Sequence, residues 1–83
     1  MDLMYFEGST PVFVNCPLRP VTNLDCYALD SVVNRFQVSK AKKVIVLFYD
    51  NKISNDIKIL CKRLNVSIMY YREFFEKINN GRL

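Results

Sequence analysis

The sequence contains no histidine, no tryptophan and only two glycines among its 83 residues. Without histidine the chain cannot supply a Ser-His or Cys-His nucleophile pair, and a histidine-ligated metal site is excluded. The scarcity of glycine and an apolar fraction of 51% indicate a folded domain rather than a disordered chain. No apolar run approaches the roughly 18 residues of a membrane span, and an acidic second residue does not fit a signal peptide. We therefore expect a cytoplasmic protein with no membrane partner.

Cysteine is also sparse, and the three cysteines, Cys16, Cys26 and Cys61, lack CxxC spacing. This pattern argues against a secreted disulfide framework and against a zinc knuckle, and it predicts buried structural thiols. A bond between Cys16 and Cys26 stays open at this stage, because some intracellular proteins use disulfides. No cofactor is expected.

A chain of this length forms one domain, 1–83, and buries a modest core. A small core favours association, so we expect a homodimer that buries aromatic side chains of the first hairpin or the last helix. The net charge of +4 is compatible with weak, salt-sensitive binding of nucleic acid.

Four strands are predicted from the apolar runs. Runs at 3–7 and 11–16, separated by Gly8-Ser9-Thr10, predict an antiparallel hairpin. The uninterrupted run 43–49 predicts a central strand covered on both faces, and 67–70 predicts a further strand.

Three helices are predicted between and after these strands. Thr22 caps the first, with Asp25 as a short-armed capping box and an apolar stripe from Leu24 to Phe36. Ser54 caps the second, and the last helix is expected to turn Phe74, Phe75 and Ile78 inward and to stop near Gly81.

The order β-β-α-β-α-β-α predicts an α/β fold with one mixed four-stranded sheet flanked by helices. Strands 11–16, 43–49 and 67–70 are expected to be parallel, because helices connect them. Ligands of such sheets bind beyond the carboxyl ends of the parallel strands. Asp50 follows one of these ends, where it is either a candidate binding carboxylate or simply part of an Asp-Asn turn.

The segments VFVNCPL, TNLDCYALDSVVNRF, KKVIVLFYD and IKILCKRLNVSIM follow one another in the chain. In this order they resemble the catalytic core of the restriction-endonuclease-like superfamily, the PD-(D/E)XK proteins, and in particular small archaeal members. The resemblance covers roughly residues 2–71 and implies that fold. It places Asp2 at the family's aspartate, Asn15 at the glutamate and Pro17 at the lysine of the cleavage motif.

This motif is degenerate, because Asn15 offers a neutral oxygen and Pro17 offers no cation. Arg19 lies nearby, but a guanidinium cannot act as a base. We therefore expect a non-catalytic, homodimeric binding module. The alternatives are a metal-dependent nuclease and a nucleic-acid-binding protein of the same fold, whose phosphate contacts would be Arg19, Lys40, Lys42 and Lys43 unless these lysines are only a solvated loop.

Overall fold

The structure is a computed structural model that describes residues 2–35, 40–48 and 52–80. Its elements are β1 (Asp2–Glu7), β2 (Thr10–Asn15), α1 (Asn23–Arg35), β3 (Lys42–Leu47), α2 (Asn55–Arg63), β4 (Val66–Tyr70) and α3 (Tyr71–Asn79). The strands form one sheet in the order β1-β2-β3-β4, with β1 antiparallel to β2 and the other neighbours parallel. The predicted α/β class, element order and mixed sheet are confirmed.

The first hairpin closes through a shorter turn than predicted. Glu7 pairs with Thr10, so Thr10 belongs to β2 and the loop is Gly8-Ser9 alone. Gly8 has φ +64° at the first loop position, which is where a type II′ turn requires glycine. Pro11 precedes the first β2–β3 pair, which is Val12 with Lys42, so its missing N–H removes no bond to β3.

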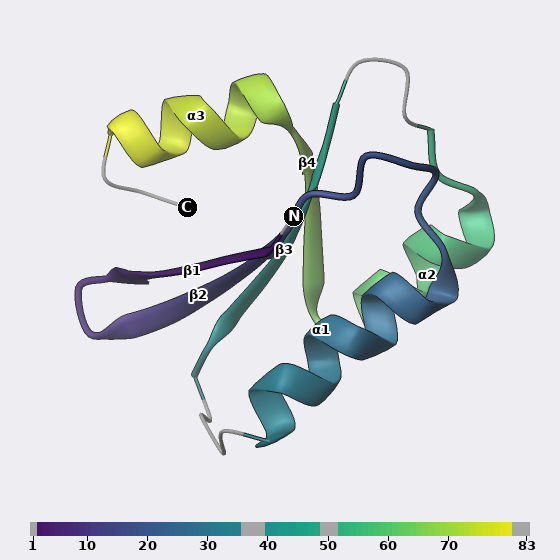
Figure 1. The fold of residues 1–83 in the computed structure, drawn as a ribbon, viewed down its shortest axis with the longest axis horizontal. Helices are drawn as coiled ribbons and strands as arrows, with labels where there is room; N and C mark the ends of the chain where they lie inside the picture. The colour runs from purple at the N-terminus through teal and green to yellow at the C-terminus, as the bar shows by residue number, and fades with distance from the viewer. Residues whose placement is uncertain (1, 36–39, 49–51, 81–83) are drawn as a thin grey trace.

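The helices divide between the two faces of the sheet (Figure 1): α1 and α2 lie on one side and α3 on the other. Residues alternate between these faces along each strand. The α1/α2 side holds the larger core, made of Phe13, Val21, Cys26, Leu29, Val33, Ile45, Leu47, Ile57, Leu60, Cys61 and Val66. The α3 side holds a smaller core of Val12, Val14, Cys16, Val44, Val46 and Phe74. The predicted burial of the third strand on both faces is confirmed.

Two helices bury a narrower face than their sequences predicted. In α1, Leu24 is 76% exposed and Asp25 is buried, because contacts of the Asp25 carboxylate turn that side chain inward. In α3, Phe74 is buried whereas Phe75 is 52% exposed and Ile78 is also exposed, contrary to prediction. The small core on this face is centred on Phe74, which makes an edge contact with the ring of Tyr5.

The Ser54 cap of α2 is confirmed, since its hydroxyl accepts the Ile57 N–H at 3.3 Å. The predicted end of the first helix at Phe36, the strand end at 49 with its Asp50 tip, and the Gly81 stop lie outside the described residues. Within the described residues, no helix has the length and apolar character needed to cross a bilayer.

Candidate functional site

The carboxyl end of β2 carries the three positions of the degenerate motif. Asp2 and Asn15 are register partners across the β1–β2 pair, so the backbone sets two of these positions opposite one another. Asn15 is half-buried and Pro17 is buried two residues further along. The backbone therefore brings positions 2 and 15 together, and the side chains at positions 15 and 17 are an amide and a proline ring.

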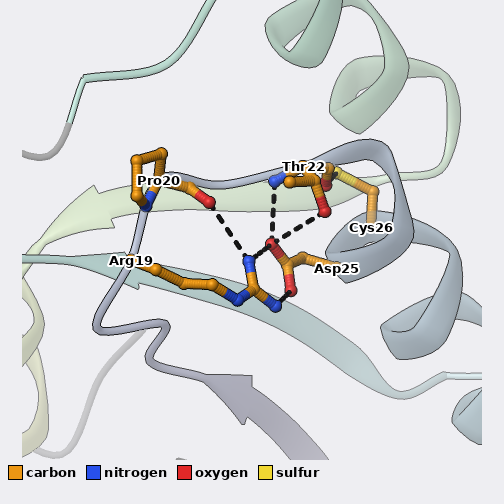
Figure 2. Close-up of polar contacts among 5 residues, drawn as sticks. All are labelled: Arg19, Pro20, Thr22, Asp25 and Cys26. Carbon is orange, nitrogen blue, oxygen red and sulfur yellow. Dashed lines mark hydrogen bonds and ion pairs between the residues drawn. The ribbon is translucent and has the colours of Figure 1, made fainter.

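Arg19 and Asp25 form the main polar contact beside this strand end (Figure 2). Arg19 Nη1 donates to Asp25 Oδ2 at 2.9 Å, and Nη2 donates to Oδ1 at 2.7 Å, which is a bidentate pair. Asp25 Oδ2 also accepts the Thr22 N–H at 2.8 Å and lies 3.4 Å from the Thr22 hydroxyl. Arg19 Nη1 makes a further bond to the Pro20 carbonyl at 3.1 Å. The pair thus fixes the loop 16–22 against the start of α1.

Asp25 is the third residue of α1, and its bond to the Thr22 N–H is one half of the predicted capping box. The hydrogen bond from Arg19 lowers the pKa of Asp25 below its ordinary value, and the Thr22 N–H acts in the same direction, although burial opposes both. The same hydrogen bond and the charge of Asp25 raise the pKa of Arg19. Asp25 is therefore held in its charged form by contacts within the domain, and Arg19 is its cationic partner.

These facts limit the chemistry that the strand end can perform. A Mg²⁺-dependent cleavage site needs anionic oxygen ligands together, and Asn15 supplies only a neutral carbonyl. Among residues 2–35, 40–48 and 52–80, no three cysteine, aspartate or glutamate side chains gather closely enough to hold a metal ion.

Two of the lysines suggested as phosphate contacts lie in ion pairs within the domain. Lys42 Nζ is 2.7 Å from Glu7 Oε1, and Lys43 Nζ is 2.9 Å from Asp30 Oδ1. Lys43 also donates to the carbonyl of Leu64. With Arg19 tied to Asp25, only Lys40 of the four suggested cations is exposed without an ion pair to a described carboxylate.

The topology gathers other cations near Lys40 that the sequence did not single out. Parallel β-α-β connections bring the starts of β3 and β4 and the ends of α1 and α2 to the same end of the sheet. Lys43 joins this end, because it bonds to Asp30 in α1 and to the carbonyl that follows α2. We call the four exposed cations here, Arg35, Lys40, Lys62 and Arg63, the basic end.

None of the basic-end side chains forms an ion pair with a described carboxylate. Lys62 and Arg63 lie in the last turn of α2, where the helix dipole favours cations, and the sequence pattern alone gave Arg35, Lys62 and Arg63 no binding role. The signal that could have found this group is the right-handed β-α-β connection, which forces helix ends and strand starts together.

A groove of about 790 Å³ lies between the first hairpin and α1. Its walls are mostly apolar and come from four segments. They are Leu3 and Met4 of β1, Phe13, Val14 and Asn15 of β2, Pro17, Leu18 and Arg19 of the loop, and Asp25, Ala28, Leu29 and Val32 of α1. Asn15 and the Arg19–Asp25 pair are the polar part of this lining.

The cysteines are buried free thiols, as predicted, but their neighbours differ from expectation. Cys26 and Cys61 place their Sγ atoms 3.3 Å apart between α1 and α2. Cys16 belongs to the core on the opposite face of the sheet. The Cys16–Cys26 bond that the sequence left open is therefore not formed.

Comparison with known proteins gives one distant similarity. The chain is 28% identical over 76 residues to the transcript termination protein A18 of Yaba-like disease virus. The match covers 92% of this chain but only 16% of the viral protein, so the chain spans a small part of that relative's length. No protein-family profile and no solved structure matches the chain at a significant level.

Proposed function

We propose that this domain is a non-catalytic nucleic-acid-binding module, which contacts the phosphate backbone through the basic end. The fold that we propose for it is a restriction-endonuclease-like core. Support for that core comes from the element order and from the opposed positions of Asp2 and Asn15. The cysteines are free thiols, in keeping with a cytoplasmic location.

The observation that carries the proposal is the cluster of exposed cations at one end of the sheet. Arg35, Lys40, Lys62 and Arg63 are exposed, and none is neutralised by a described carboxylate. Lys42 and Lys43, at the start of β3, are already paired with Glu7 and Asp30. Cations clustered at one end attract a polyanion such as a phosphate backbone more strongly than the same charges spread over the surface.

We propose a non-catalytic module because of the residues at the carboxyl end of β2. Asn15 and Pro17 replace the charged groups that phosphodiester cleavage requires, and Asp25 is held by Arg19 and Thr22. The distant viral relative is named for transcript termination, a process that takes place on nucleic acid. A module that holds nucleic acid without cutting it is in keeping with that name.

The test is fluorescence anisotropy with a labelled single-stranded RNA and a labelled DNA duplex at roughly 50 mM and 200 mM salt. The test variant carries Arg35→Gln, Lys40→Gln, Lys62→Gln and Arg63→Gln. The matched control carries Lys52→Gln, Lys58→Gln, Arg72→Gln and Lys77→Gln, which removes the same charge from other surfaces. Far-ultraviolet circular dichroism confirms that both variants are folded.

We expect the basic-end variant to lose about tenfold or more in affinity and the control variant to lose little. For single-stranded RNA, each phosphate contact contributes about −0.7 to the slope of log affinity against log salt. The basic-end variant should therefore show a shallower slope than the control. Equal losses in the two variants, or no binding by the wild type at low salt, would contradict the proposal.

A further inference from the structure

Phe6 is the most exposed aromatic side chain in the described part of the chain, at 61%. It lies near the end of β1, next to the hairpin turn, and its register partner on β2 is Pro11. Phe6 follows Met4 by two residues, and Met4 is the register partner of the core residue Phe13. Because side chains alternate along a strand, Phe6 is on the α1 side of the sheet. The domain thus leaves a flat apolar ring open to solvent at one end of its sheet.

The end of the sheet that carries Phe6 also carries the basic end. Because β2 and β3 are parallel, the hairpin turn that precedes β2 lies at the same end as the start of β3 (Figure 1). An ion pair joins the two segments, since Lys42 Nζ is 2.7 Å from Oε1 of Glu7, the residue after Phe6. Lys40 comes two residues before Lys42, and Arg35 ends α1. The exposed ring and the exposed cations therefore occupy one end of the domain.

Two acids at this end are held by lysines. Glu7 is paired with Lys42. Asp30 of α1 has its Oδ1 atom 2.9 Å from Lys43 Nζ. Each ion pair has no net charge, so neither of these acids adds a net negative charge beside Phe6. A polyanion that is attracted to the basic end can therefore approach the ring.

An exposed ring beside exposed cations has the chemistry of a site for single strands. Such sites combine cations that follow the phosphates with aromatic side chains on which the bases stack. A duplex offers the same phosphates, but its bases are already paired and stacked on one another, so a surface ring adds little to duplex binding. The ring therefore bears on the choice between the two forms of nucleic acid.

From this juxtaposition we propose that Phe6 stacks on an unpaired base of a strand whose phosphates are bound by the basic end. The domain then prefers single-stranded nucleic acid to a duplex. This inference rests on the proposed function, and it adds a substrate class and an uncharged residue that recognises it.

The probes are three labelled nucleic acids of equal length, about 12 nucleotides, which lies within the usual range of site sizes. They are a thymidine strand, an abasic strand that keeps the phosphates and lacks the bases, and a duplex. Phe6→Leu removes the ring and keeps an apolar side chain, whereas Phe6→Tyr keeps a ring. The matched control is Tyr27→Leu, which removes a 49% exposed ring from the first half of α1. Far-ultraviolet circular dichroism confirms that the variants are folded.

We expect Phe6→Leu to lower the affinity for the thymidine strand by about fivefold or more, because the stacking contact is lost. Its affinities for the abasic strand and for the duplex should match those of the wild type. Phe6→Tyr and Tyr27→Leu should bind all three probes as the wild type does. Because Phe6→Leu removes no charge, its salt slope should stay unchanged, whereas the basic-end variant shows a shallower one.

Two kinds of failure can be told apart. Salt-dependent binding of the thymidine strand that Phe6→Leu leaves unchanged, or an equal loss for all three probes, would overturn this inference and leave the proposed function standing. A wild type that binds none of the three probes at low salt would overturn the proposed function and this inference together.

Discussion

The Sγ atoms of Cys26 and Cys61 lie 3.3 Å apart and join α1 to α2 inside the larger core. Both thiols are almost completely buried, and burial, reinforced by the neighbouring Cys26, raises the pKa of Cys61 to about 12. The thiolate is the reactive form of cysteine, so this pair is chemically quiet in the folded chain. We expect a thiol-specific disulfide reagent to leave Cys26 and Cys61 unmodified at neutral pH and to modify them after unfolding in guanidinium chloride. Rapid native-state modification would contradict the packing described.

The raised pKa of Cys61 also predicts a dependence of stability on alkaline pH. In the unfolded chain this thiol ionises at its ordinary pKa of about 8.5, whereas in the folded chain its pKa is raised to about 12. Its contribution to the free energy of unfolding is therefore complete below about pH 8.5 and is lost progressively above it. Urea titrations of the wild type and Cys61→Ala across this range should converge, and a constant difference would contradict the assignment.

Removing the carboxylate of Asp25 should destabilise the domain. Asp25 is buried and accepts bonds from Arg19 and Thr22, so Asp25→Ala leaves the Thr22 N–H and the guanidinium without this partner. We expect a loss of about 1–3 kcal/mol in the free energy of unfolding. Asp56→Ala, which removes an exposed acid in the first turn of α2, is the matched control and should cost less.

The same carboxylate predicts the response to acid. Because the folded-state pKa of Asp25 is lowered, its contribution is complete above the unfolded value of about 3.9 and is lost as the pH falls through the folded value. The difference in stability between wild type and Asp25→Ala should therefore shrink below about pH 4. A difference that stays constant down to pH 2 would mean that the Arg19 pair does not hold the charge.

The strand end should lack Mg²⁺-dependent cleavage activity. We expect no nicking of supercoiled plasmid DNA by the wild type with Mg²⁺ or Mn²⁺, because Asn15 and Pro17 cannot replace a ligand and a cation. The double variant Asn15→Glu with Pro17→Lys sets a carboxylate at the position opposite Asp2 and should gain activity. Asn15→Gln with Pro17→Ala is the inactive control. Cleavage by the wild type that Asp2→Ala abolishes would show that the site is not degenerate.

The homodimer expected from the small core stays a prediction. Phe75 is half-exposed on α3 beside Ile78, which makes this helix a candidate contact surface. We expect sedimentation equilibrium to show a species of twice the 9.8 kDa chain mass, which Phe75→Ser would convert to the monomer. A monomer alone at concentrations of about tens of micromolar would count decisively against it.

Periodicity in the sequence was sufficient to predict the sheet and the order of its elements. The apolar run through β3 must be covered on both faces, and that requirement alone sets it in the interior of the sheet. The Ser54 cap and the bond from the Thr22 N–H to Asp25 could also be predicted, because capping uses residues within a few positions of each other.

Long-range contacts were beyond the reach of local patterns. A helical stripe cannot reveal that Arg19 would hold Asp25 inward and leave Leu24 in solvent. Nor can it show that Arg35, Lys40 and Lys62 share one end, because they belong to separate segments that only the fold brings together. The apolar residues of α3 likewise predicted a wider buried face than this nine-residue helix has, since Phe74 is buried and Phe75 is exposed.

The sheet itself separates Cys16 from Cys26, although only a short loop and one helical turn connect them in the chain. In the unfolded chain the two thiols meet often, since closing a short loop costs little entropy. Oxidation at that moment would tie together two residues that the native structure holds on opposite sides of a layer of strands. Refolding yield should therefore depend on the redox potential of the buffer, with oxidising conditions accumulating a cross-linked species that reaches the native state only after reduction.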